Sequence, residues 1–180
     1  MKIVLETPRL LLREMTLADL DFVAEMLAHP EVMRFYPKLY SRDEAQAWVE
    51  RQLGRYTQHG HGLWLVLDKH SLSPLGQVGL LTQEVDGLLE PEIGYLIHRP
   101  FWRQGFATEA ASTVKQYALK EGGHNYVISL VRPENEPSQG VARKLGMQPV
   151  RETLFRDIRH LVFQVSTESE RLCAGSELAR

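Results

Sequence analysis

A strand-like run, a turn with one glycine and a helix-like run follow one another between Pro91 and Ala111. Residues 93–97 are mostly apolar, with β-branched and aromatic side chains as strands prefer, and residues 107–111 are mostly good helix formers. The turn between them contains Arg103 and Gly105. Backbone N–H groups that open a helix bind anions, and a neighbouring guanidinium favours a phosphate-like one. The stretch therefore predicts a binding site for a phosphate-like group.

Apolar runs and their periodicities predict the elements that hold this site. Strands are expected at residues 9–13, 63–67, 75–81, 92–97, 126–131, 147–155 and 158–165, and helices at residues 20–27, 45–56, 107–119 and 138–145. Capping boxes at Thr16 and Ser41 precede the first two helices, and Asn135 or Glu136 is expected to cap the last one. Hairpins make the middle strands antiparallel, while a helical crossover makes the next strand parallel. The order of elements predicts an α/β fold.

The composition is that of an ordinary globular domain. The chain has 180 residues, 43% hydrophobic and 24% charged, and we expect one domain over residues 1–166 followed by a tail at residues 167–180. The formal net charge of -2 argues against binding to nucleic acid. A single cysteine, Cys173, excludes an internal disulfide and fits a reducing compartment. No apolar run has the length of a signal peptide or a membrane span, so we expect a cytoplasmic protein without a membrane partner.

Two histidines, His59 and His61, come nearest to a metal-ligand pattern. Structural zinc sites have four ligands, and no third ligand of suitable spacing lies near these two. We therefore interpret both as turn residues and predict no metal site.

Three segments of the chain resemble the GNAT N-acetyltransferase superfamily, and in particular its RimJ/RimL-like branch of ribosomal-protein alanine N-acetyltransferases. The segments are Thr7-Pro8-Arg9-Leu10-Leu11-Leu12-Arg13, Glu92-Ile93-Gly94-Tyr95 through Trp102 to Ala110, and Asn135-Glu136-Pro137-Ser138 through Lys144 to Met147. Trp102 stands where the pattern of the superfamily has Gln or Arg, and this substitution is usual in the RimJ/RimL-like branch. The resemblance implies a mixed, mostly antiparallel central sheet with helices on both faces.

The resemblance also implies that acetyl-CoA is the acetyl donor. Its pyrophosphate would bind the backbone of the turn, at Arg103, Gln104, Gly105, Phe106, Ala107 and Thr108. Gly105 would let that backbone approach closely. The pantetheine arm would pair with Ile97 and its neighbours, and Asn135 would meet its other side. A backbone N–H between Tyr95 and Ile97 is expected to donate to the thioester oxygen.

Acetyl transfer to an amine requires a group that removes the ammonium proton, because an α-amine is only about a tenth neutral at pH 7. Glu92 heads the strand that the resemblance places beside the thioester, so we expect it to be the general base, directly or through a water. Glu90 is the second candidate. Either carboxylate would also attract a cationic amine. Glu84 and Asp86, in the same acidic group, are interpreted as solvated turn residues.

The departing thiolate needs little or no help from an acid, since its pKa is near that of cysteine, about 8.5. Many GNAT enzymes have a tyrosine acid in the helix after the fifth strand, and Ala142 occupies that position here. Ser138 either donates a hydrogen bond to the leaving sulfur or only caps the last helix. Tyr36 and Tyr126 are unplaced alternatives.

The leading functional hypothesis is acetyl transfer from acetyl-CoA to the α-amine of a protein N-terminus. A small amine, such as an aminoglycoside, a polyamine or an amino acid, is the alternative acceptor, and a catalytically silent acyl-CoA-binding module is the alternative from another class. Residues 31–40 contain three aromatic side chains (Phe35, Tyr36 and Tyr40) and one proline (Pro37), and they either cover the core or form one wall of an acceptor pocket. The family includes monomers and dimers, so a homodimer is left open.

Overall fold

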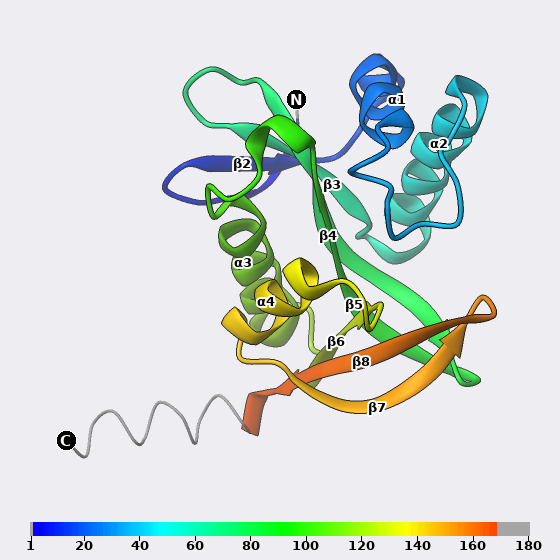
Figure 1. Cartoon of the computed structure of the whole chain (residues 1–180). Helices are drawn as coiled ribbons and strands as arrows, with labels where there is room; N and C mark the ends of the chain where they lie inside the picture. Colours follow the sequence, from blue (N-terminus) through cyan, green and yellow to red (C-terminus); the bar gives the residue numbers. More distant parts are fainter. Residues whose placement is uncertain (1, 169–180) are drawn as a thin grey trace.

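An eight-stranded sheet with the order β1-β2-β3-β4-β5-β6-β8-β7 runs through the computed structural model, which describes residues 2–168 (Figure 1). Neighbouring strands are antiparallel except for β5 and β6. The strands are β1 (Ile3–Glu6), β2 (Leu10–Arg13), β3 (Leu63–Asp68), β4 (Pro74–Val85), β5 (Leu88–Ile97), β6 (Tyr126–Val131), β7 (Gln148–Phe155) and β8 (Ile158–Ser166). The helices are α1 (Leu20–Ala28), α2 (Arg42–His59), α3 (Phe106–Lys120) and α4 (Glu136–Lys144), with 3-10 turns at Leu17–Asp19 and Arg99–Phe101. The predicted α/β fold with a mostly antiparallel sheet is confirmed.

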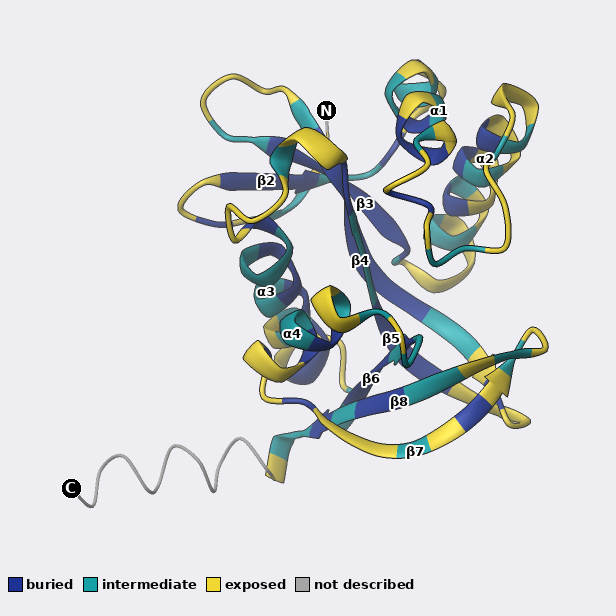
Figure 2. Cartoon of the chain, viewed as in Figure 1, coloured by how far each residue is buried: buried dark blue, intermediate teal, exposed yellow. Residues whose placement is uncertain are grey.

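Alternating side chains along the strands supply one hydrophobic core on each face of the sheet. On β3, Trp64 and Val66 belong to the core under α3 and α4, whereas Leu63, Leu65 and Leu67 belong to the core under α1 and α2. Figure 1 shows these two helix pairs on opposite sides of the strands, and Figure 2 shows the buried strand segments between them. The expected placement of helices on both faces is therefore confirmed.

Three strands differ from the predicted elements. β1 pairs with β2 and was not predicted, because its apolar run is only three residues long. β4 and β5 extend further than predicted, to a two-residue turn at Asp86 and Gly87 with φ of 53° and 79°. The extension contains polar residues, and it is held by a backbone ladder that does not depend on apolar side chains.

The helix starts follow the predicted capping residues. Ser41 accepts a hydrogen bond from the Glu44 N–H, and the two residues form a capping box before α2. Asn135 caps α4, since its Oδ1 accepts from the Ser138 N–H at 3.2 Å. That helix therefore begins at Glu136, two residues before its predicted start.

The end of the described chain follows β8 directly. The Thr167 N–H donates to the Asn125 carbonyl at 2.9 Å. Residues 169–180 of the predicted tail, including Cys173, lie outside the described residues. Within residues 2–168, no helix combines the length and the apolar character that a membrane span needs.

Strands β5 and β6 diverge, and their divergence opens the centre of the sheet. They are paired at one position, Glu92 with Ile128. One residue further along, the Ser129 hydroxyl donates to the Ile93 carbonyl at 2.9 Å. From residue 94 to residue 97, β5 has no ladder partner on that side among the described residues. This edge of β5 is consequently free to pair with an extended ligand.

Candidate active site

A cleft of about 1200 Å³ runs along the free edge of β5. Its walls come from β5, the turn before α3, the start of α4, helix α2 and the loop of residues 31–40. Most of the predicted site residues line it, namely Glu92, Tyr95, Ile97, Arg103, Gly105, Phe106, Ala107, Thr108, Asn135 and Ser138. Glu90 and Gln104 are outside its lining. One cleft thus contains both most of the residues predicted to bind the donor and the predicted base, Glu92.

The turn before α3 presents a row of backbone N–H groups. Gly105 caps the helix in the left-handed region at φ 83°, and Arg103 lies in the same region at φ 61°. Within the described chain, no carbonyl or side chain accepts a hydrogen bond from the N–H groups of residues 103–108. A row of free donors at the start of a helix of 15 residues fits an anion such as a pyrophosphate.

Trp102 connects this turn to the end of β5 through a hydrogen bond. Its indole N–H donates to the Ile97 carbonyl at 2.6 Å. The Arg99 guanidinium lies over the Trp102 ring, 5.0 Å from its centroid. The residue that departs from the general superfamily pattern therefore has a structural role in this chain.

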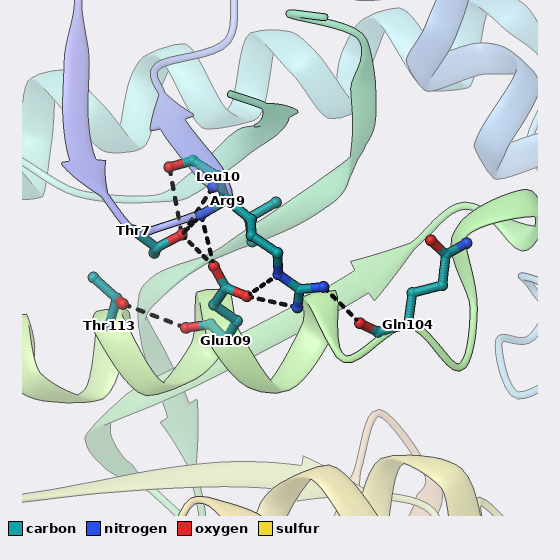
Figure 3. Close-up of polar contacts among 6 residues, drawn as sticks. All are labelled: Thr7, Arg9, Leu10, Gln104, Glu109 and Thr113. Atoms are coloured by element: carbon teal, nitrogen blue, oxygen red, sulfur yellow. Dashed lines mark hydrogen bonds and ion pairs between the residues drawn. The ribbon is translucent and has the colours of Figure 1, made fainter. Parts of the chain in front are cut away.

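Two residues near the N-terminus hold the same turn from outside the cleft (Figure 3). The Thr7 hydroxyl donates to Glu109 Oε1 at 2.6 Å, and Arg9 Nε donates to Glu109 Oε2 at 2.7 Å. Arg9 Nη1 also donates to the Gln104 carbonyl at 3.1 Å. The Arg9 guanidinium lies over the Phe106 ring, 4.6 Å from its centroid. The predicted cofactor residue Gln104 is thus tied to Arg9 through its backbone.

Glu92 lies at the opposite end of the free stretch of β5 and has only 8% of its surface exposed. Gln83 Nε2 donates to Glu92 Oε2 at 2.9 Å. Burial raises the pKa of the Glu92 carboxyl, although the hydrogen bond from Gln83 and the charges of Arg55 and Arg156 oppose this shift. A carboxylate with a raised pKa is better matched to proton transfer near neutral pH.

Glu90 lies two residues nearer the hairpin, where β6 and β7 supply its partners. It accepts hydrogen bonds from the Tyr126 hydroxyl at 2.5 Å and from Arg151 Nη2 at 3.1 Å, and it is 5% exposed. Asp86, interpreted as a solvated turn residue, is exposed but also forms an ion pair with Arg151. Glu90 and Tyr126 are therefore engaged with each other, outside the lining of the cleft to which Glu92 contributes.

The start of α4 lies across the cleft from β5. Because Asn135 caps the helix, the Ser138 hydroxyl is not needed for capping, and it makes no hydrogen bond to a described residue. The Tyr95 hydroxyl donates to the Ser138 carbonyl at 2.8 Å and joins the two walls. Ala142 is fully buried in the core. Tyr36 lines the cleft, and desolvation raises the pKa of its hydroxyl to about 12.

Among the cleft residues that sequence patterns did not identify, Gln83, Arg55 and Arg156 act on Glu92. The hairpin register would have identified Gln83, because the two-residue turn sets it diagonally opposite Glu92 on the same face. Arg55 comes from α2 and Arg156 from the turn between β7 and β8, and no local pattern relates them to the strand they approach.

His59 and His61 pack against each other, although His59 is the last residue of α2 and not a turn residue as interpreted from the sequence. The rings of His59 and His61 stack with centroids 5.9 Å apart, and His124 meets His61 edge-on at 6.5 Å. Among residues 2–168, no three His, Cys, Asp or Glu side chains are grouped so that they could hold a metal ion.

The sequence profile of the acetyltransferase (GNAT) domain matches residues 9–148. The chain belongs to the GNAT acetyltransferase family. Its relative in Bacillus subtilis (strain 168), the uncharacterized protein YkkB, is 33% identical over 147 residues, which are 81% of this chain and 86% of YkkB. As a GNAT enzyme, the protein is an N-acetyltransferase.

Solved GNAT structures share the fold of this acetyltransferase. A putative GNAT-family acetyltransferase from Bordetella pertussis superposes with a TM-score of 0.78 at 22% identity, covering 91% of this chain and 99% of that one. RimL, described as a ribosomal L7/L12 alpha-N-protein acetyltransferase in complex with coenzyme A, gives a TM-score of 0.76 at 13% identity, covering 93% and 99%. At these identities the similarity establishes the fold alone.

Proposed function

We propose that this GNAT enzyme transfers the acetyl group of acetyl-CoA to a primary amine, and that the acceptor is the α-amine of a protein N-terminus. The proposal rests on one cleft that contains three parts of an acetyl-transfer site. These parts are the free N–H groups of residues 103–108, the open edge of β5 at residues 94–97 and the buried carboxyl of Glu92.

The two parts nearest α3 suit the donor. The N–H row and the guanidinium of Arg103 would hold the pyrophosphate, and Gly105 allows the close backbone approach that this requires. The amides of the pantetheine arm would pair with β5 as an added strand, with Asn135 and Ser138 on the other side. The orphaned N–H groups and the unpaired strand edge are the observations that fit this ligand.

The remaining part suits the acceptor amine. Glu92 would take the proton of the ammonium group, directly or through a water, so that the neutral amine forms the new C–N bond as the C–S bond breaks. A backbone N–H between Tyr95 and Ile97 would donate to the thioester oxygen, a contact whose loss typically costs ~3 kcal/mol. The Ser138 hydroxyl is the candidate donor to the leaving sulfur. A buried carboxyl with a raised pKa favours a catalyst over a silent acyl-CoA-binding module.

The cleft has room for an acceptor beside the donor. Its volume of about 1200 Å³ includes the donor part at residues 103–108, and its lining also includes Glu92 and the loop of residues 31–40. RimL, a protein α-N-acetyltransferase by its description, has the same fold. A small amine is the alternative acceptor.

A thiol-release assay with acetyl-CoA tests the proposal. Peptides with a free N-terminus should be acetylated faster than the same peptides with a blocked N-terminus, and faster than aminoglycosides or polyamines. Binding of acetyl-CoA without turnover of any amine would favour the silent module. Failure to bind acetyl-CoA would contradict both.

A further inference from the structure

Three arginines line the same cleft as Glu92. Arg51 and Arg55 come from α2, and Arg156 comes from the turn between β7 and β8. Burial lowers the pKa of the Arg55 guanidinium, and the positive charges of Arg51 and Arg156 lower it further. The charges of Arg55 and Arg156 also act on the Glu92 carboxyl. All four charged groups line one cleft, and we treat Arg51, Arg55, Arg156 and Glu92 together as one cluster.

None of these three arginines has a carboxylate partner among the described residues. Arg51 and Arg156 lie over aromatic rings, with their guanidinium carbons 5.4 Å from the Trp48 centroid and 5.1 Å from the Phe155 centroid. Arg55 donates only to the Gln52 amide oxygen, at 3.4 Å. Their guanidinium N–H groups are therefore available to a ligand.

Most described arginines outside the cleft are paired. Ion pairs join Arg9 to Glu109, Arg13 to Asp19, Arg42 to Asp21, Arg151 to Asp86 and Arg159 to Glu152. The described arginines without such a pair are Arg34, Arg51, Arg55, Arg103, Arg143 and Arg156, and all of these except Arg143 line the cleft. Five of the seven described arginines that line the cleft are thus unpaired, the exceptions being Arg99 and Arg132, whereas five of the six outside it are paired.

The cluster holds more positive than negative charge. Glu92 is the one carboxylate in this cluster of four groups, and it loses its charge each time it takes a proton. Like charges held close together in a partly buried site repel one another, and an anion that binds between them relieves this repulsion. A guanidinium also binds a carboxylate with two parallel hydrogen bonds, which fixes its orientation.

We propose that the acceptor of this enzyme carries a carboxylate close to its amine, and that Arg51, Arg55 and Arg156 bind this carboxylate while Glu92 faces the amine. This inference rests on the proposed acetyl transfer and narrows its acceptor. The carboxylate is either the acidic side chain of a residue near a peptide N-terminus or the α-carboxylate of a free amino acid. A polycationic acceptor would be repelled by the same arginines.

Matched acceptors test the inference in the thiol-release assay. One set is a short peptide that begins with serine and has Glu, Gln or Lys at its second and third positions. The other set is an amino acid and its α-amide. We expect kcat/KM to be at least about tenfold higher for the Glu peptide than for the Gln peptide, or for the amino acid than for its amide, as one charge-assisted hydrogen bond would give. A preference in the peptide set would identify the carboxylate as an acidic side chain, and a preference in the other set would identify it as the α-carboxylate of an amino acid.

Variants assign the preference to the arginines. The triple variant Arg51→Gln, Arg55→Gln, Arg156→Gln should reduce the ratio of kcat/KM for the charged acceptor to kcat/KM for the neutral one to about one. Arg42→Gln is the matched control. Arg42 is on α2, as Arg51 and Arg55 are, but it is paired with Asp21 and is outside the cleft lining. It should keep the ratio of the unaltered enzyme. Equal rates for charged and neutral acceptors in both sets would overturn the inference.

A binding measurement separates this inference from the proposed function. Calorimetry of the same acceptors with the CoA-bound protein detects the arginine site without turnover. A preference for the carboxylate in binding, with no acetylation of any acceptor, would contradict the proposed function and leave the site standing. Acetylation with no preference in binding or rate would contradict the site alone.

Discussion

Arg9 and Glu109 are one hundred positions apart in the sequence, and Arg9 donates to Glu109 through both its side chain and its backbone, beside the turn before α3. The Arg9 side chain donates to Glu109 Oε2 at 2.7 Å, while the Arg9 backbone N–H donates to Oε1 at 3.1 Å. Arg9 is outside the cleft lining, but its guanidinium also holds the Gln104 carbonyl inside the turn. The N-terminal segment therefore positions a turn whose proposed ligand it does not contact.

Replacing Glu109 should weaken CoA binding without affecting the chemical step. Glu109→Gln keeps an acceptor for Thr7 but removes the ion pair with Arg9, so the turn is less well held. Because the pair is partly exposed, we expect the Kd for CoA to rise by about threefold to tenfold, or ~1 kcal/mol. Calorimetry measures this Kd, and kcat at saturating acetyl-CoA should change little.

Glu152→Gln provides the control for this effect. It breaks the pair between Arg159 and Glu152, at 2.7 Å on β7 and β8, which is outside the cleft lining. The Kd for CoA should stay at its original value. The positioning role of Glu109 is wrong if the two variants bind CoA equally well.

Much of the fold, and the part of the candidate site at the turn before α3, could be predicted because local sequence patterns encode them. Apolar runs identify β3 and β6, and the run of helix formers after Gly105 identifies the turn before α3. β1 was not predicted because a strand of four residues at the sheet edge has little pattern of its own. The acceptor end depends on α2 and the β7–β8 turn meeting β5, and such tertiary contacts leave no local pattern.

The choice between Glu90 and Glu92 illustrates the same limit. Both are carboxylates on one strand, two residues apart. The sequence distinguishes them only by how close each lies to the expected position of the thioester. Their environments differ because β6 and β7 bring Tyr126 and Arg151 to Glu90, whereas the divergence of β6 leaves Glu92 beside the cleft. Glu92 therefore stays the proposed base, and Glu90 the second candidate.

Glu92→Gln should lower kcat while leaving donor binding intact. The amide can still accept a hydrogen bond from Gln83 but cannot take a proton, and general-base catalysis is typically worth about 10²–10⁴ in rate. We expect kcat to fall by at least about a hundredfold, with the Kd for CoA within error of the original value. Single-turnover thiol release and calorimetry measure the two quantities.

Glu90→Gln is the matched substitution on the same strand. It weakens the contacts to Tyr126 and Arg151 and should lower Tm, with kcat close to that of the unaltered enzyme. Loss of kcat in this variant, without loss of Tm, would transfer the role of base to Glu90.

Removing a positive charge near Glu92 should move the acidic limb of the pH profile. The charge of Arg156 lowers the pKa of Glu92 and so opposes the effect of burial. Arg156→Gln removes that charge, so the pKa of Glu92 rises and the base becomes protonated at a higher pH. The acidic limb of kcat should shift upward when a neutral acceptor is used at saturation.

The comparison is internally controlled. The acceptor amine also titrates, but its contribution is common to both proteins and cancels in the difference. Arg42→Gln should leave the limb in place, since Arg42 is paired with Asp21 outside the cleft lining. A limb that stays in place, or moves downward, in Arg156→Gln would show that Glu92 does not set it.

Ser138→Ala separates the two roles considered for this hydroxyl. Because Asn135 caps α4 and the Ser138 hydroxyl has no partner among the described residues, the free energy of unfolding should change by no more than about 0.5 kcal/mol. If the hydroxyl donates to the leaving sulfur, kcat should fall by about tenfold, a modest loss since a thiolate with a pKa near 8.5 leaves readily.

Asn135→Ala should instead cost about 1 kcal/mol of stability through loss of the cap. Thermal unfolding and thiol release on both variants distinguish the two roles. If Ser138 only caps the helix, Ser138→Ala should lose stability as Asn135→Ala does and keep the original kcat.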